Sequence, residues 1–171
     1  MKPTTQSRLK KGATVTAVAV ALITGFEGVR TVAYRDSVGV ATVCIGETKN
    51  VHMGDHYTKQ QCFDMLGARL PDYEQAMDKC LKHPDALPDA SFVALLSFSY
   101  NLGTNCAWSV YRDINAGNLS QGCLDMLGFD HAGGHVLAGL KTRREKESAL
   151  CLEGVEGVKI DAIAKQMKVT G

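Results

Sequence analysis

The sequence lacks a surplus of charge of either sign. Its 171 residues carry 19 Lys and Arg against 18 Asp and Glu, which gives a net charge of +1. Proteins that bind nucleic acid usually show a strong basic surplus, so we expect no nucleic-acid partner. Hydrophobic residues make up 45% and charged residues 22% of the chain, as is usual for a soluble globular protein. The length suits one domain, or two lobes sharing one core.

Several short motifs of ligand-binding and catalytic sites are also missing. The chain has no Gly-rich phosphate-binding loop and no Gly-x-Ser-x-Gly elbow. His52 and His56 have the spacing of zinc ligands on a helix, and so do His131 and His135. Both pairs lie beside glycines in segments that predict turns, so we interpret them as surface histidines and expect no metal site.

The six cysteines include no closely spaced pair. The nearest neighbours are 17 residues apart, which argues against a structural zinc site. An even number of dispersed cysteines indicates disulfides formed in an oxidising compartment such as a periplasm, although six free thiols in a cytosolic protein would have the same spacing. We expect neighbours along the chain to pair, as Cys44–Cys62, Cys80–Cys106 and Cys123–Cys151.

The N-terminal segment poses a membrane question. Residues 1–11 carry four basic residues and no acid, and residues 12–26 carry no charge. A basic flank before an apolar run is typical of an export signal or a signal anchor. The run is only 15 residues long and includes three Thr and two Gly. Since a stable span needs about 20 apolar residues, a bilayer would hold this segment weakly.

Three interpretations of residues 12–26 stay open: a weak uncleaved anchor, a buried helix, and a signal peptide cleaved after Ala21. Cleavage there would leave five residues before Glu27, too few for a supporting helix. We therefore favour the anchor, which divides the chain into an anchor segment, 1–26, and a folded domain, 27–171.

The rest of the chain predicts a mainly helical fold with one small hairpin. Residues 29–45 are rich in β-branched residues and are broken at 36–39, which indicates a hairpin. Thr58 and Gln61 have capping-box spacing, and the helix they predict is either kinked at Pro71 or divided there. The predicted helices cover residues 59–80, 92–101, 107–115, 119–128 and 136–152.

Glu27, Asp36 and Thr42 are candidates for carbohydrate chemistry. Glycoside hydrolysis usually needs one carboxylic acid to protonate the leaving oxygen and one carboxylate on the other side of the bond. Glu27 follows an apolar stretch, and low hydration favours the protonated form of a carboxyl group. Asp36 lies in a turn and should stay ionised, while the Thr42 hydroxyl could donate to Asp36 and accept from a water. A Glu and an Asp nine residues apart are, by themselves, common in a chain with 18 acids.

Several motifs in order strengthen this interpretation. The segment 25–39 with Thr42 resembles the signature of phage-type lysozymes, glycoside hydrolase family 24, which places Glu, eight residues, Asp, five residues and Thr. The resemblance covers roughly residues 22–153. It continues at Tyr100-Asn101-Leu102-Gly103, Ala132-Gly133-Gly134, Gly139-Leu140, Arg143-Arg144-Glu145 and Leu150-Cys151-Leu152.

The resemblance implies a mainly α (α+β), two-lobed lysozyme-like fold, with a small N-terminal β-hairpin lobe and a helical C-terminal lobe. It implies a monomeric muramidase that cuts the β-1,4 bond between N-acetylmuramic acid and N-acetylglucosamine in peptidoglycan, with inversion and without cofactor or metal. Glu27 would be the proton donor, and Asp36 and Thr42 would hold the water. Arg143 would orient Glu27, and Asn101 would contact sugar.

The N-terminal segment resembles that of signal-anchor-release endolysins. Such enzymes are exported, stay tethered and inactive at the host inner membrane, and are freed into the periplasm when the membrane depolarises. No cysteine precedes Cys44, so a thiol switch in the anchor is excluded. Control would be positional, with residues 12–26 in the bilayer before release and in the helix that presents Glu27 afterwards.

Two departures from the family pattern lie close to the expected cleft. Glu47 stands where many relatives have His, which adds an acid near Glu27, and Phe129 stands where a Trp is common. Two other functions stay open. A non-catalytic wall-binding module would be expected to lose Glu27 or Asp36, and a transglycosylase-like lyase would lack the water-holding Asp36 and Thr42.

Overall fold

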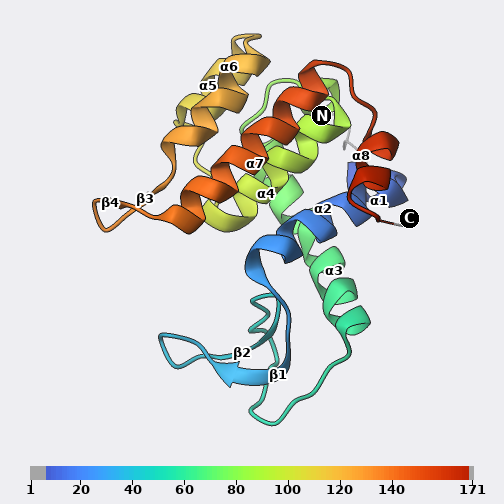
Figure 1. Ribbon diagram of the computed structural model, residues 1–171, viewed down its shortest axis with the longest axis vertical. Helices are drawn as coiled ribbons and strands as arrows, with labels where there is room; N and C mark the ends of the chain where they lie inside the picture. Colours follow the sequence, from blue (N-terminus) through green and yellow to red (C-terminus); the bar gives the residue numbers. More distant parts are fainter. Residues whose placement is uncertain (1–6, 170–171) are drawn as a thin grey trace.

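The computed structural model describes residues 7–169, which form a helical lobe and a smaller hairpin lobe (Figure 1). This mainly helical, two-lobed architecture confirms the predicted fold class. The helices are α1 Arg8–Lys11, α2 Ala13–Glu27, α3 Lys59–Asp78, α4 Asp89–Leu102, α5 Ser109–Asn115, α6 Leu119–Asp125, α7 Ala138–Val155 and α8 Ile160–Gln166, with 3-10 turns at Pro84–Ala86 and Met126–Gly128. The strands are β1 Arg30–Arg35, β2 Ala41–Cys44, β3 His131–Ala132 and β4 His135–Val136.

Helix α4 is the centre of the helical lobe. Every residue from Ala90 to Ser99 is buried, and the helix has no charge after Asp89. A helix that is apolar all round is expected to be covered on every side. α7 and α2 pack against it, and the α5–α6 pair packs beside α7 (Figure 1). The prediction of a buried helix over 92–101 is thus confirmed, with one more turn at its start.

The hairpin lobe holds the predicted N-terminal hairpin. β1 and β2 are antiparallel, with Tyr34 opposite Thr42 and Arg35 opposite Ala41. The turn between them uses Gly39 at φ 84°, a left-handed conformation that costs glycine little. Helix α3 leads from this lobe back to the helical lobe (Figure 1). Its capping box at Thr58 and Gln61 is present as predicted.

Pro71 lies inside α3, which runs as one helix from Lys59 to Asp78. The alternative in which Pro71 opens a second segment is therefore wrong. The sequence also did not predict α1, α8 or the short β3–β4 hairpin around Gly133-Gly134. These elements are at most seven residues long, too short for a clear hydrophobic period.

Three disulfides join the elements as neighbour pairing predicts. Cys44–Cys62 ties β2 to α3, Cys80–Cys106 ties the end of α3 to the loop before α5, and Cys123–Cys151 ties α6 to α7. No cysteine within the described residues is free. The disulfides therefore link the hairpin lobe, α3 and the two sides of the helical lobe covalently.

The apolar segment 12–26 forms most of α2 and lies in the core. Val18, Ala19 and Ile23 are fully buried, and α2 contacts α4, α3 and α8. This is the arrangement that the buried-helix interpretation describes. Among residues 7–169, no helix is both long and apolar enough to cross a membrane.

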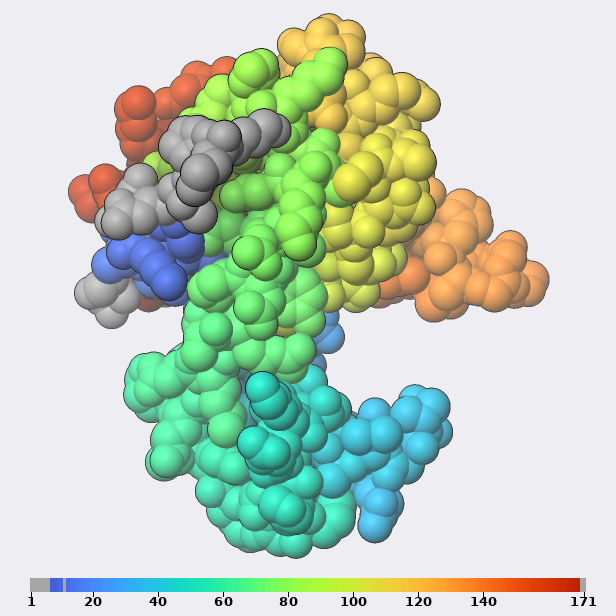
Figure 2. Space-filling view, turned by 180° about the vertical axis from the view of Figure 1, so that it is seen from behind, coloured from blue at the N-terminus to red at the C-terminus, as the bar shows by residue number. Residues whose placement is uncertain are grey.

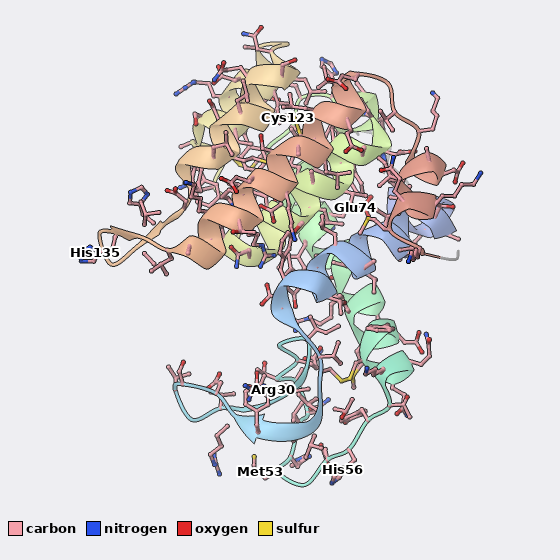
Figure 3. The ribbon with its side chains drawn as sticks, viewed as in Figure 1. Arg30, Met53, His56, Glu74, Cys123 and His135 are labelled. Atoms are coloured by element: carbon pink, nitrogen blue, oxygen red, sulfur yellow. A yellow bond between two sulfur atoms is a disulfide. The ribbon has the colours of Figure 1, made fainter. Side chains whose placement is uncertain are left out.

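The chain just before α2 is held by the acidic side of α3. The Arg8 backbone N–H donates to Glu74 Oε1 at 2.6 Å, and the Ser7 hydroxyl donates to the same carboxylate, which is buried near α1 (Figure 3). The Arg8 guanidinium donates to the carbonyls of Leu87 and Pro84. One turn beyond Glu74, burial raises the pKa of Asp78 to about 6, with a further contribution from the negative charge of Glu74.

This elevated pKa predicts that Asp78 destabilises the folded protein at neutral pH. Below the ordinary carboxyl pKa of 3.8, both folded and unfolded chains hold the proton. The penalty builds as pH rises from there to about 6, and it is complete above that pH. We expect Asp78→Asn to raise Tm at pH 7, with a gain that disappears as pH falls below 4.

Asp72→Asn is the matched control, because it removes an exposed carboxylate from the same helix. Thermal unfolding at a series of pH values measures both variants. A gain for Asp78→Asn that is equal at pH 4 and pH 7 would contradict the assignment.

Candidate active site

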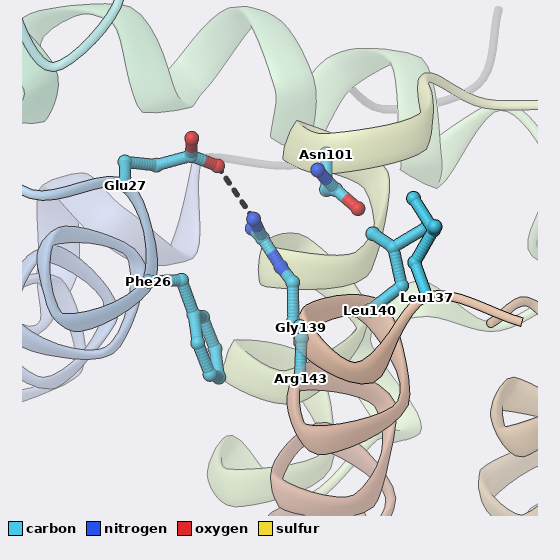
Figure 4. Close-up of a pocket in the computed structure, with 7 residues that line it drawn as sticks. All are labelled: Phe26, Glu27, Asn101, Leu137, Gly139, Leu140 and Arg143. Carbon is cyan, nitrogen blue, oxygen red and sulfur yellow. Dashed lines mark hydrogen bonds and ion pairs between the residues drawn. The ribbon is translucent and has the colours of Figure 1, made fainter. Parts of the chain in front are cut away.

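The candidate active site is a pocket of about 380 Å³ where α2, α4 and α7 meet. Figure 4 shows its lining residues: Phe26, Glu27, Asn101, Leu137, Gly139, Leu140 and Arg143. Three of the five residues predicted for the site, Glu27, Asn101 and Arg143, are brought together here from distant parts of the sequence. In the space-filling view, the surface is hollowed between the β1–β2 side and the β3–β4 side of the molecule (Figure 2).

Glu27 is the last residue of α2, and Gly28 ends the helix at φ 72°. Its side chain is 33% exposed, and Arg143 Nη1 lies 2.5 Å from its Oε1 (Figure 4). The carboxyl group is therefore held from one side by a buried cation while the other side stays open to the pocket. Such a group can exchange a proton with a bound molecule.

Arg143 is fixed by several contacts of its own. Its side chain is 5% exposed, Nε donates to Glu147 Oε1 at 3.0 Å, and Nη2 donates to the Ser97 carbonyl at 3.3 Å. The guanidinium carbon lies 4.8 Å from the centre of the Phe26 ring. The interpretation of Arg143 as a solvated residue on a helix face is wrong, because α7 turns this side chain into the protein.

Asn101 lies near the end of α4, across the pocket from Glu27 (Figure 4). Its Oδ1 accepts a hydrogen bond at 3.0 Å from Nη2 of Arg144, which is fully buried. The amide oxygen is thereby held by the protein.

Asp36 and Thr42 do not line this pocket; they lie in the hairpin lobe. Asp36 Oδ1 accepts from the backbone N–H groups of Val38 and Val40 at 3.0 and 2.9 Å, which fixes the carboxylate at the turn. Thr42 is 3% exposed, and its hydroxyl donates to the Val40 carbonyl at 3.0 Å. The expected donation from Thr42 to Asp36 is thus wrong, because a backbone carbonyl two residues back takes this proton.

The two departures from the family pattern are both accommodated. Glu47 Oε1 accepts from the backbone N–H groups of Thr48 and Lys49, and its Oε2 lies 3.3 Å from Arg69. The carboxylate thus caps its own turn and is paired with a cation. Phe129 packs against Phe98 and Trp108, with ring centroids 5.1 and 5.0 Å apart, so it belongs to an aromatic cluster of the helical lobe.

Tyr100, on α4, lies where the two lobes meet. Its hydroxyl donates to the Ile45 carbonyl at 2.6 Å, which joins α4 to the hairpin lobe. Burial raises its pKa to about 12, and the charges of Tyr73, Glu27 and Glu47 add to the rise. Tyr100 therefore stays protonated, as a hydrogen-bond donor, at neutral pH.

The histidine pairs with metal-ligand spacing lie on the surface. His52 faces Asp55 in a loop of the hairpin lobe, and His131 faces Asp130 beside β3. His135 lies at the exposed tip of the β3–β4 hairpin (Figure 3). Within the part of the chain that the structure describes, no group of three or more His, Cys, Asp or Glu side chains could hold a metal ion.

Sequence reasoning did not identify the buried residues behind the site. Glu147, Arg144 and Ser97 are fully buried, and they contact Arg143 or Asn101. The sequence signal for this group was its spacing: Glu147 follows Arg143 by four residues and Arg144 by three, on a helix whose other face is apolar. That spacing is also common on solvated helices, so it could not show whether these side chains are buried.

Comparison with known proteins identifies the family. The family described as Phage lysozyme matches residues 24–147. The chain belongs to the phage lysozyme family. This membership makes it a glycoside hydrolase of the lysozyme type.

A SAR-endolysin of Enterobacteria phage PA-2 is 36% identical over 147 residues, covering 81% of this chain and 88% of the relative. The active form of the P1 phage endolysin Lyz is 29% identical, with a TM-score of 0.72, covering 81% of this chain and 84% of that one. The muramidase domain of SpmX from Asticaccaulis excentricus is 28% identical, with a TM-score of 0.71, covering 78% of this chain and 94% of that one.

The contacts of Arg143 predict its importance for stability. Arg143→Met leaves Glu147 with one cation instead of two, and removing one partner of a buried ion pair costs about 3 kcal/mol. Lys146→Met is the matched control. Lys146 is exposed, and its Nζ also lies over the Phe26 ring, at 5.8 Å, without contacting either carboxylate.

Urea unfolding measures both variants. We expect a large loss of unfolding free energy for Arg143→Met, and a change within about 0.5 kcal/mol for Lys146→Met. Equal losses would show that the ring contact, and not the ion pair, determines the effect.

Proposed function

We propose that this lysozyme hydrolyses the β-1,4 bond between N-acetylmuramic acid and N-acetylglucosamine in peptidoglycan, with inversion at the anomeric carbon. One observation carries the proposal. Glu27, held by the buried Arg143, opens into a pocket of the helical lobe, while Asp36 is fixed on the separate hairpin lobe. Two carboxyl groups carried by two separate lobes are what an inverting glycosidase needs on the two sides of its substrate.

Glu27 acts as the general acid in this scheme. It donates its proton to the glycosidic oxygen as the bond to the leaving sugar breaks. Because Arg143 contacts only one side of the carboxyl group, the proton can sit on the oxygen that faces the pocket. As the proton leaves, Arg143 stabilises the carboxylate that forms.

Asp36 acts as the general base on the water that attacks the anomeric carbon. Its Oδ1 is held by two backbone N–H groups, and no hydrogen bond among residues 7–169 engages Oδ2, so this oxygen can accept the proton of the water. The Thr42 hydroxyl already donates to Val40, and its lone pairs can accept from the same water. An inverting enzyme needs its carboxyl groups about 6.5–9.5 Å apart to leave room for that water.

Asn101 contacts the sugar in the pocket through its amide group. Its Oδ1 is taken by Arg144, so the amide N–H₂ is the part that can donate to a sugar hydroxyl or carbonyl. All these groups belong to one chain, and we expect the enzyme to act as a monomer.

Clearing of purified peptidoglycan tests the catalytic assignment. We expect Glu27→Gln and Asp36→Asn to lower the clearing rate by at least about 100-fold, since each removes a proton-transfer step. Thr42→Val should lower it by about 10-fold, because Asp36 remains. Asp64→Asn, an exposed acid on α3, serves as the control and should clear like the wild type.

Full clearing by Glu27→Gln or Asp36→Asn would refute the assignment. A wild type that binds the wall without clearing it would favour the binding module. Products ending in anhydro-muramic acid would favour the lyase.

We further propose that residues 1–26 export the chain to the periplasm and tether it to the host inner membrane through residues 12–26, as in signal-anchor-release endolysins. The relatives that carry that name support this. α2 buries Val18, Ala19 and Ile23 and ends at Glu27, so the folded site needs this segment in the protein. While the segment lies in a bilayer, that helix cannot support Glu27, and the enzyme is inactive.

Making the segment more apolar should delay release. Ala13 and Thr14 are not part of the buried face of α2, so Ala13→Leu/Thr14→Leu raises the hydrophobicity with little effect on the folded protein. Each added apolar side chain strengthens membrane insertion. The control is Ala13→Ser/Thr14→Ser, which changes the same positions in the polar direction.

Membrane and soluble fractions from cells of a bacterium with two membranes measure the effect. We expect a larger membrane-bound fraction and later lysis for the Leu variant, with unchanged activity of the purified, detergent-free protein. Equal partition of the Leu and Ser variants would contradict the anchor.

A further inference from the structure

Behind the pocket lies a buried acid that the proposed mechanism does not use. Glu147 on α7 is fully buried and is contacted by two arginines of its own helix, Arg143 and Arg144. The Ser97 hydroxyl, from α4, donates to Glu147 Oε1 at 2.6 Å. A buried carboxylate is costly unless it is paired and hydrogen-bonded, so this arrangement needs an explanation.

Each carboxylate oxygen of Glu147 contacts an arginine that in turn holds one of the residues lining the pocket. Oε1 accepts from Arg143 Nε, and the same guanidinium holds Glu27 through Nη1. Oε2 lies 2.8 Å from Arg144 Nε, and the same guanidinium donates from Nη2 to Asn101. One carboxylate thus lies between the cation that holds the proposed acid and the cation that holds the proposed sugar contact.

The two oxygens of Glu147 differ in the kind of contact they make. On the Oε1 side, both Ser97 and Arg143 make aligned hydrogen bonds. On the Oε2 side, the contact with Arg144 Nε is an ion pair at 2.8 Å, and neither of these two atoms has another partner among the described residues. Glu147 therefore holds Arg143 by a hydrogen bond and Arg144 by charge attraction at 2.8 Å.

The contacts favour an ionised Glu147. Burial raises the pKa of this carboxyl group, and Arg144, the Ser97 hydroxyl and Arg143 each offset part of the rise. Guanidinium N–H groups only donate, so a protonated Glu147 would leave two buried cations without a counter-charge. Glu27, whose side chain is 33% exposed, pairs with the same Arg143 on the side of the pocket.

We propose that Glu147 is a positioning residue for this enzyme, which sets the place and the available charge of Arg143 at Glu27 and, through Arg144, the place of Asn101. It acts through these side chains and does not line the pocket. The proposal rests on the assignment of Glu27 as the general acid.

Removing the charge of Glu147 should therefore change the chemical step and its pH dependence together. In the wild type, the positive charge of Arg143 faces both Glu147 and Glu27. Without the Glu147 charge, Arg143 acts on Glu27 alone and favours its ionised form, which cannot donate a proton. Glu27 is also faced by Tyr100 and, at longer range, by Arg144. Tyr100 is not altered by the substitution, whereas Arg144 also loses the opposing charge of Glu147 and acts on Glu27 in the same direction as Arg143. The alkaline limb of the kcat/KM profile should move to lower pH.

The test measures kcat and KM between pH 4 and 9 on soluble peptidoglycan fragments of defined length. We expect Glu147→Gln to lower kcat by about 10- to 100-fold, since small misplacements of a catalytic group have effects of this size. Its alkaline limb should move to lower pH, and its KM should rise because Asn101 loses support. Glu145→Gln, an exposed acid on the same helix, is the matched control and should match the wild type.

Ser97→Ala keeps the test decisive if Glu147→Gln does not fold, which circular dichroism would show. It removes only the hydroxyl on the Oε1 side and keeps the carbonyl that Arg143 uses. We expect a fall in kcat of several-fold, in the range that one hydrogen bond supplies, with KM unchanged.

Glu27→Gln separates the two claims. If it is inactive while folded Glu147→Gln and Ser97→Ala match the wild type in kcat and pH profile, the positioning proposal fails alone. An equal loss of kcat at every pH, with no shift of the alkaline limb, would indicate a purely structural role for Glu147. That result would also overturn the positioning proposal. If Glu27→Gln is fully active, the proposed function itself fails.

Discussion

The ion pair between Glu27 and Arg143 is the contact on which the rest of the site depends. It joins the end of α2 to α7 across 116 residues of sequence. The Arg143 side chain is 5% exposed, and a cation so placed needs compensating contacts. Glu147, the Ser97 carbonyl and the Phe26 ring provide them, so the packing of α4 and α7 also fixes the cation beside the proposed acid.

If residues 12–26 are the proposed anchor, helix α2 meets two requirements that usually conflict. A weakly held membrane segment must be short, uncharged and only moderately apolar, and a core helix must bury a continuous face. Val18, Ala19 and Ile23 supply that face, while Thr and Gly residues keep the whole segment below the hydrophobicity of a stable span. Placing Glu27 at the end of this helix links the proposed acid to the location of the segment.

Much of this could be predicted from sequence, for identifiable reasons. The hairpin, the α3 capping box and the buried α4 depend on local patterns, and neighbouring cysteines paired as expected. The inward direction of Arg143 depends on contacts with Glu27 and Ser97, which are distant in the sequence. The Thr42 hydroxyl donates to Val40, only two residues away, but this direction depends on how the turn between β1 and β2 folds. Glu147 illustrates the limit best, because its burial follows from the packing of α7 on α4 and not from its neighbours in the chain.

The central claim is that Glu27 and Asp36 act on opposite sides of the sugar, with a water between Asp36 and the anomeric carbon. The anomeric configuration of the first product, followed by proton NMR during hydrolysis of a soluble peptidoglycan fragment, tests it most directly. The account predicts that the new reducing end appears first as the α-anomer and later equilibrates. A product that appears first as the β-anomer would contradict it, because retention requires a covalent intermediate or its equivalent.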